Sequence, residues 1–146
     1  MRIVIQRVKR ASVNINGKIS GEINHGLLLL VGIHHNDTKE IINWCCKKIS
    51  KLRVFNDEDD KMNLSLQDVK GGLLVVSQFT LYGNARKGTR PSFIEAAKPA
   101  VAEPLYNYML QKFEEMKIEK VESGEFGAMM NVELINDGPV TIVLEK

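Results

Sequence analysis

Two long apolar runs dominate the hydrophobic pattern of this chain. Leu27–Ile33 and Leu73–Val76 consist almost entirely of aliphatic residues, which is typical of strands buried on both faces. The Gly71-Gly72 pair disfavours a helix before the second run, and Ser77 follows it. We therefore expect two central strands, the second of which ends among polar residues.

The N-terminal part of the chain alternates apolar and polar residues instead. Residues 2–8 and 11–15 are predicted strands, and Asn16-Gly17 before residues 18–20 predicts a hairpin with a type I′ turn. Shorter apolar stretches predict three further strands, at 52–55, 128–135 and 139–144. The last two of these strands would be joined through residues 136–138.

Apolar residues at helical spacing predict two helices. The first begins near Asp37, since Asp37 and Glu40 have the spacing of a capping box, and the second runs from about Pro99 to Met116. Pro104 should cost the second helix a hydrogen bond or shift its start. With no repeat and no linker, the pattern predicts one domain over residues 1–146, with more strands than helices.

Composition is that of an ordinary globular protein, with 44% hydrophobic residues, 26% charged residues and a net charge of +2. No stretch approaches the ~20 apolar residues of a membrane span, and residues 1–7 hold too few apolar residues for a signal peptide. We expect a cytoplasmic protein. Cys45 and Cys46 are sequence neighbours on a predicted helix, so we expect buried, unpaired side chains.

Charge is distributed unevenly along the chain. Residues 57–60 are all acidic, whereas basic residues gather in three places: Arg2, Arg7, Lys9 and Arg10; Lys47, Lys48, Lys51 and Arg53; and Arg86, Lys87 and Arg90. Such patches can hold phosphates, but many are simply solvated surfaces. Charge alone leaves RNA binding open.

Side chains alone give covalent or metal catalysis little support. Ser77 and Thr80 offer hydroxyl groups at a strand end, but none of the three histidines, His25, His34 and His35, is near them in sequence. Adjacent His34 and His35 would point to opposite sides of an extended chain, and no residues stand at zinc spacing. No nucleotide-binding loop is present. The alternative for Thr80 is a hydroxyl bonded to backbone.

The Gly138-Pro139 pair has two interpretations. Glycine allows close backbone approach and proline removes an N–H, so the pair can present two bare carbonyl oxygens to a ligand. The alternative is a simple hairpin turn.

Two motifs connect these observations. Ser77-Gln78-Phe79-Thr80 and Asn136-x-Gly138-Pro139-Val140-Thr141 resemble the signature motifs of the D-aminoacyl-tRNA deacylases. The resemblance spans the chain and includes residues 6–13, the Asn16-Gly17 hairpin, residues 61–65 and residues 90–93.

The resemblance implies a fold, a reaction and a partner. Members of the family are cofactor-free, metal-free homodimers with an α/β, three-layer fold of two packed sheet layers and two main helices. They hydrolyse the ester between a D-amino acid, or glycine, and the 3′-terminal adenosine of tRNA. By resemblance, a cis Gly138-Pro139 segment enters the partner's active site at the subunit interface and excludes L-aminoacyl-tRNA. Arg7 would hold that segment.

The resemblance also implies roles at the first motif. Backbone N–H groups of Phe79 and Thr80 would stabilise the oxyanion, while Ser77 and Gln78 would line the pocket. Thr80 is the usual catalytic candidate, but the terminal ribose 2′-hydroxyl of the tRNA would assist hydrolysis. Phe126 would stack on the adenine, or else be a core aromatic. The alternatives are a non-catalytic RNA-binding module and an esterase with a Thr80 nucleophile.

Overall fold

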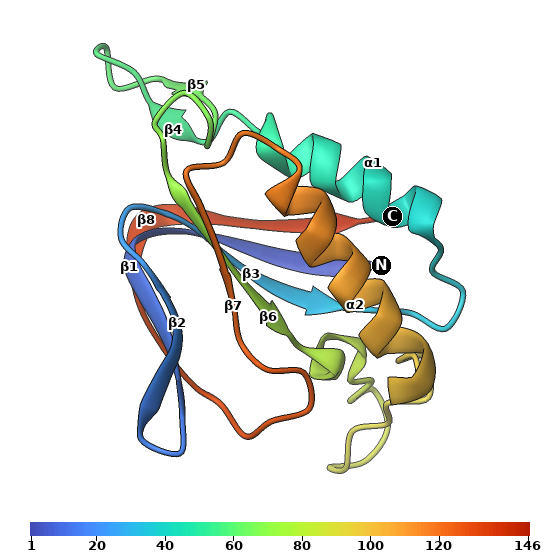
Figure 1. Ribbon diagram of the computed structural model, residues 1–146. Coiled ribbons are helices and arrows are strands. Elements are labelled where there is room, and N and C mark those ends of the chain that lie inside the picture. Colours follow the sequence, from blue (N-terminus) through green and yellow to red (C-terminus); the bar gives the residue numbers. More distant parts are fainter.

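The computed structural model describes residues 1–146, which form eight strands, two α-helices and one 3₁₀ helix (Figure 1). In chain order these are β1 (Arg2–Ile15), β2 (Lys18–Ile23), β3 (Gly26–Gly32), α1 (Lys39–Ser50), β4 (Phe55–Asn56), β5 (Met62–Leu64), β6 (Gly72–Ser77), η1 (Phe79–Tyr82), α2 (Pro99–Glu114), β7 (Lys120–Ser123) and β8 (Asn131–Glu145). Neither α-helix is long and apolar enough to cross a membrane.

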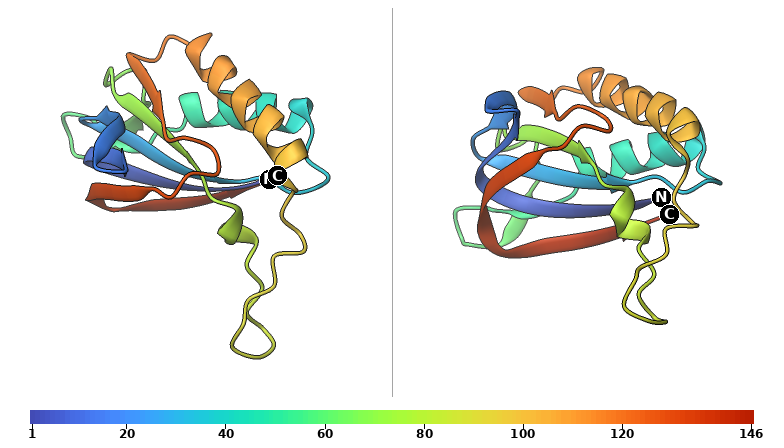
Figure 2. Two further views of the ribbon diagram at one scale, coloured as in Figure 1. Left: turned by 60° about the horizontal axis from the view of Figure 1, so that its bottom comes forward. Right: turned by 90° about the horizontal axis from the view of Figure 1, so that it is seen from below.

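Six strands form one strongly curled sheet. Its order is β2-β1-β3-β6-β7, with β8 also paired to β1, and only the β3–β6 and β6–β7 pairs are parallel. The first half of β1 pairs with β3, its second half pairs with β2, and β8 follows it along both halves. The sheet therefore bends back on itself until β2 packs against β7 (Figure 2).

Each face of this sheet covers a separate core. Alternate residues such as Leu27, Leu29 and Val75 pack toward α1 and α2, while Leu28 and Leu74 fill the inside of the curl. Burial on both faces explains why β3 and β6 are continuous apolar runs. The expected α/β fold with two main helices is confirmed; its two sheet layers are the two halves of one curled sheet, and β4 and β5 form a separate small sheet.

The predicted N-terminal hairpin is present. Asn16 and Gly17 have φ angles of 51° and 82°, the left-handed values that a type I′ turn needs, and the Gly17 N–H donates to Asn14 Oδ1 at 2.9 Å. The separate predicted strands at 2–8 and 11–15 are one continuous strand, β1.

The start of the first helix differs from the prediction. The helix α1 begins at Lys39, and the Asp37 carboxylate does not cap it: it accepts from the Met1 ammonium at 2.6 Å and from the His34 N–H at 2.7 Å. Because the chain turns here, the rings of His34 and His35 stack with centroids 3.9 Å apart. The expectation that these rings point to opposite sides is wrong.

One other expectation about the elements is wrong, and for Pro104 the structure decides between the two alternatives. Only Phe55–Asn56 is a strand in the region where 52–55 was predicted, because the Val54 carbonyl accepts from the Arg7 side chain and not from a neighbouring strand. Pro104 leaves the start of α2 unchanged; it lies on the exposed side, where water can hydrate the carbonyl that it leaves unpaired.

The two cysteines are buried and unpaired, as expected. Burial raises the pKa of the Cys45 thiol to about 11 and that of Cys46 to about 12. Both are therefore protonated, unreactive core residues at neutral pH.

Candidate active site

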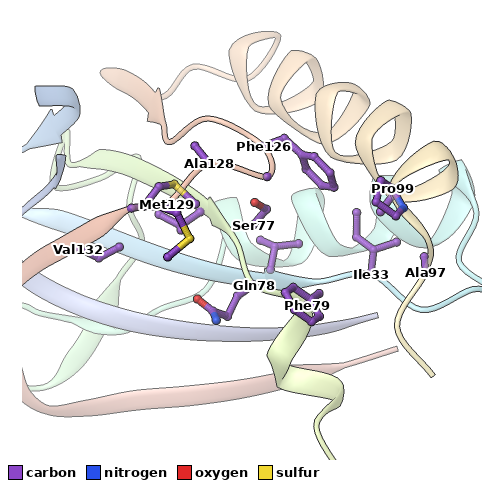
Figure 3. A pocket seen from close by; sticks show the side chains of 15 residues that line it. Ile33, Ser77, Gln78, Phe79, Ala97, Pro99, Phe126, Ala128, Met129 and Val132 are labelled. Atoms are coloured by element: carbon purple, nitrogen blue, oxygen red, sulfur yellow. The ribbon is translucent and has the colours of Figure 1, made fainter. Parts of the chain in front are cut away.

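A cavity of about 510 Å³ lies where β6 ends, beneath the start of α2 (Figure 3). Eleven of its fifteen lining residues are hydrophobic, and none has a titratable side chain. Ser77, Gln78 and Phe79 form one wall, and Phe126 and Met129 form another. The cavity thus offers an apolar surface with a few polar groups at one strand end, the usual character of a small-ligand site.

The polar wall arises because β6 stops and the chain turns into η1. The Gln78 N–H donates to the Val31 carbonyl at 2.7 Å, which keeps the chain beside β3 for one residue beyond the strand. The Gln78 side-chain amide donates to the Thr80 hydroxyl. Thr80 itself is exposed and lies next to the cavity, outside its lining. No carboxylate or imidazole is bonded to that hydroxyl.

The turn η1 has two free backbone donors. The N–H groups of Phe79 and Thr80 have no acceptor within the chain, as expected for the first residues of a helical turn. The other end of η1 is anchored, because the Arg2 guanidinium donates to the Leu81 carbonyl at 2.6 Å and lies 5.0 Å from the centre of the Tyr82 ring. Burial raises the pKa of Tyr82 to about 12.

The wall of the cavity that contains Phe126 is also held to β6, through contacts of neighbouring residues. Phe126 contacts Tyr106 of α2, with ring centroids 5.8 Å apart. The buried Tyr106 hydroxyl donates to the Val75 carbonyl at 2.8 Å, and that carbonyl also accepts from the Gly124 N–H at 3.1 Å. The Val75 carbonyl, two residues before Ser77 in β6, therefore links this strand both to α2 and to the loop before β8.

Replacing Tyr106 with Phe should lower the free energy of unfolding by about 1 kcal/mol, the usual net value of one hydrogen bond. The cost stays moderate because Gly124 still satisfies the Val75 carbonyl. Urea-induced unfolding of the wild-type protein and the variant measures this difference in the free energy of unfolding. Tyr108→Phe is the matched control: its hydroxyl bonds the Asn43 side chain at a half-buried position, so its loss should cost less. Equal costs for the two variants would contradict this expectation.

The second motif forms a looped-out segment within β8. Gln6 pairs with Thr141 and Val8 pairs with Asn136, so residues 137–140 lie opposite Arg7 alone. The expectation of two strands joined by a turn, and the alternative of a hairpin turn, are both wrong. The chain continues along β1 in the same direction on both sides of the segment. The Gly138-Pro139 peptide is cis, and both residues are exposed.

Arg7 holds this segment from inside the protein. Its Nε lies 3.0 Å from Asp137 Oδ2 and donates to the Asp137 carbonyl at 3.1 Å. The Asn136 amide closes the segment by donating to the carbonyls of Arg7 and Val140, at 2.9 and 3.2 Å. Arg7 is 7% exposed, so it does not belong to a surface basic patch as its sequence neighbours suggested.

The predicted site residues thus fall into two groups. Ser77, Gln78, Phe79 and Phe126 line the cavity and Thr80 lies beside it, whereas Arg7, Gly138 and Pro139 do not line it. Arg7 pairs with Leu27 at one end of β3, and Gln78 bonds Val31 near the other. Within one chain the two groups remain apart.

Several lining residues had no signal in the sequence. Met129, Met130, Ala97, Pro99 and Ala102 reach the cavity only because the loop before β8 and the start of α2 fold over the end of β6. The basic residues Arg86, Lys87 and Arg90 are exposed on a loop closed by the Asn84–Ser92 bridge, which projects from the body of the protein (Figure 2). No group of acidic, histidine or cysteine residues is arranged to hold a metal ion.

Fold and cavity together define an α/β protein with a small-ligand site at a strand end. Residues 4–145 match the family model described as D-Tyr-tRNA(Tyr) deacylase. Two curated relatives named D-aminoacyl-tRNA deacylase, from Exiguobacterium sibiricum and Fusobacterium nucleatum, are each 58% identical; the matches cover 100% and 99% of this chain and 100% and 95% of theirs. The chain belongs to the D-Tyr-tRNA(Tyr) deacylase family.

Solved structures agree with this fold. One described as "c-Myc DNA Unwinding Element Binding Protein" has a TM-score of 0.93 at 41% identity, covering 100% of this chain and 99% of its own. A second, described as a probable eukaryotic D-amino acid tRNA deacylase, has a TM-score of 0.84 at 16% identity, and at that identity it supports the fold alone.

Proposed function

We propose that this chain, as one domain over residues 1–146, hydrolyses the ester bond of D-aminoacyl-tRNA and of glycyl-tRNA and rejects L-aminoacyl-tRNA. Family membership supports the D-aminoacyl-tRNA reaction. The observation that carries the rest is the pairing of an apolar cavity at Ser77–Phe79 with an exposed Gly138-Pro139 segment that Arg7 and Asn136 hold in place and that does not reach the cavity of its own chain.

The cavity has the features that ester hydrolysis at a tRNA 3′ end needs. The terminal adenine would lie against the apolar wall and stack on Phe126, while the ester carbonyl approaches η1. Attack on the carbonyl creates an oxyanion, and the free N–H groups of Phe79 and Thr80 would stabilise it. Ser77 and Gln78 would hold the substrate in place.

In this proposal the hydroxyl that assists hydrolysis comes from the substrate. The cavity wall contains no titratable side chain, and the Thr80 hydroxyl is bonded only to the Gln78 amide, which cannot take a proton from it. The ribose 2′-hydroxyl, which is adjacent to the ester in aminoacyl-tRNA, would direct the attacking water. The protein would thus supply position and oxyanion donors, without a cofactor.

A homodimer would complete the site. The η1 turn lies at the start of β1, where Arg2 anchors it, whereas the Gly138-Pro139 segment lies beside Arg7 near the middle of β1; the five residues of strand between them span ~17 Å. A two-fold axis across β1 and β8 would therefore bring each segment to the partner's η1. Exposed apolar side chains on β8 and at η1 support the contact: Ile135, Val143, Phe79 and Phe93.

Selection by handedness follows from this arrangement. The carbonyl oxygens of Gly138 and Pro139 would occupy the volume that an L side chain needs, so a D side chain fits on the other side of the α-carbon. Glycine has no side chain and would not be excluded by this wall. Arg7 keeps the wall rigid through Asp137, and rigid backbone is required for a steric filter.

The rest of the tRNA would meet the basic loop. Arg86, Lys87 and Arg90 are exposed on one projecting loop, where they can contact acceptor-stem phosphates without reading sequence. Such contacts suit an enzyme that accepts many tRNAs. Action on tRNA would place the protein in the cytoplasm.

Deacylation of matched D-Tyr-tRNA and L-Tyr-tRNA tests the proposal. We expect hydrolysis of the D substrate and of Gly-tRNA, with kcat/KM for the L substrate lower by at least about 100-fold, as for a steric exclusion of about 3 kcal/mol. Similar rates for D and L substrates would refute the filter. Tight tRNA binding without turnover would instead favour a non-catalytic RNA-binding role.

A further inference from the structure

The Arg7 side chain has a second set of partners that the proposed function does not use. Besides Asp137, its guanidinium donates from Nη1 to the Val54 carbonyl at 2.6 Å and to Asn56 Oδ1 at 3.1 Å. Val54 precedes β4 and Asn56 ends it. One buried cation therefore joins the looped-out segment of β8 to the β4–β5 hairpin, which lies far from it in sequence.

The residues immediately before and after Asn56 in the chain fix its position in the hairpin. On one side Phe55 is 2% exposed and packs edge-on against the His25 ring, with centroids 5.0 Å apart. On the other side the Asp57 N–H donates to the Lys61 carbonyl at 2.8 Å. The Asn56 carboxamide is therefore presented to Arg7 by a backbone that has little freedom to move.

The acidic run 57–60 contributes to that rigidity. The Asp57 carboxylate accepts from the Asn63 amide at 2.6 Å and from the N–H groups of Asp59 and Lys61 at 2.9 and 3.0 Å. These bonds, the Asn63 bond first, hold the pKa of Asp57 below its ordinary value. The acidic run is thus a hydrogen-bonded turn that closes the hairpin.

We propose that Asn56 is a positioning residue for chiral selection, which keeps Arg7 aligned on Asp137 and so fixes the Gly138-Pro139 carbonyls. Without the Asn56 oxygen, Nη1 retains only the Val54 carbonyl, so one contact fewer opposes rotation of the guanidinium. Rotation would loosen both Nε contacts to Asp137. A mobile segment no longer occupies the L side-chain volume at all times.

This inference rests on the proposed function, and its test separates the two. The measured quantity is the ratio of kcat/KM for D-Tyr-tRNA to that for L-Tyr-tRNA. We expect Asn56→Ala to lower the ratio about 10-fold, mainly through faster L hydrolysis, because a hydrogen bond to a charged group is lost. Asn56→Asp restores an acceptor for Arg7 and should return the ratio to within about 3-fold of the wild-type value.

The matched control is Met62→Ala, which changes the exposed residue paired with Asn56 on the same hairpin and removes none of the hydrogen bonds of Arg7. It should leave the ratio unchanged. If Asn56→Ala slows both substrates equally, its role is structural and the inference fails, as it does if the ratio is unaltered. A wild-type protein that fails to discriminate at all would refute the proposed function itself.

Discussion

A substrate whose terminal adenosine lacks the 2′-hydroxyl is expected to be hydrolysed at least about 100-fold more slowly, since a positioned acid–base group contributes 10²–10⁴-fold to a rate. The reason lies in the cavity wall, whose fifteen residues include no histidine, carboxylate, lysine or tyrosine. In the proposed mechanism, attack by water therefore depends on a group that the tRNA brings with it.

The comparison needs D-Tyr-tRNA ending in 2′-deoxyadenosine beside the normal substrate, both esterified at the 3′-oxygen. A neighbouring hydroxyl also speeds uncatalysed ester hydrolysis, so each enzymatic rate is divided by the rate without enzyme. Binding of the deoxy substrate, measured by competition, should change by less than about 10-fold, because one hydrogen bond is lost. An equal acceleration of both substrates, with an acyl group trapped on Thr80, would support a Thr80 nucleophile instead.

The sequence predicted the central strands and the cavity's polar wall well. Local signals are sufficient there: the runs at 27–33 and 73–76 are buried on both faces, and Ser77–Phe79 follow directly at a strand end. The Asn16-Gly17 turn was equally clear, because its φ angles depend on those two residues alone. The roles proposed for Phe79, Thr80, Gly138 and Pro139 came from the family resemblance.

The features that sequence reasoning missed depend on contacts between distant residues. Arg7 looks like a surface cation beside Lys9 and Arg10, but partners 47 and 130 residues away allow it to be buried. Asp37 has the spacing of a helix cap, yet the Met1 ammonium is a stronger partner for its carboxylate. The interruption at 136–138 suggests a turn, and only pairing with β1 on both sides reveals the looped-out segment.

Pairing two inactive variants should restore activity if each site takes its Gly138-Pro139 segment from the other subunit. Ala128→Trp fills the cavity from a half-buried loop position. Gly138→Ala adds a methyl whose carbon would lie 3.0 Å from Asn136 Oδ1, which displaces the segment or obstructs even D substrates. We expect each homodimer to lose at least about 100-fold in kcat/KM, as for misplacement of a substrate by about 1 Å.

The heterodimer of these variants combines one damaged and one intact site. An intact cavity from the Gly138→Ala subunit receives an intact segment from the Ala128→Trp subunit, while the other site has both defects. Heterodimers isolated through two different C-terminal tags, since an N-terminal tag would remove the Met1 ammonium that pairs with buried Asp37, should therefore have about half of the wild-type activity per dimer. The wild-type/Ala128→Trp heterodimer is the control and should also reach about half. If the mixed heterodimer is as inactive as its parents, each cavity uses the segment of its own chain, and the proposed two-subunit site is wrong.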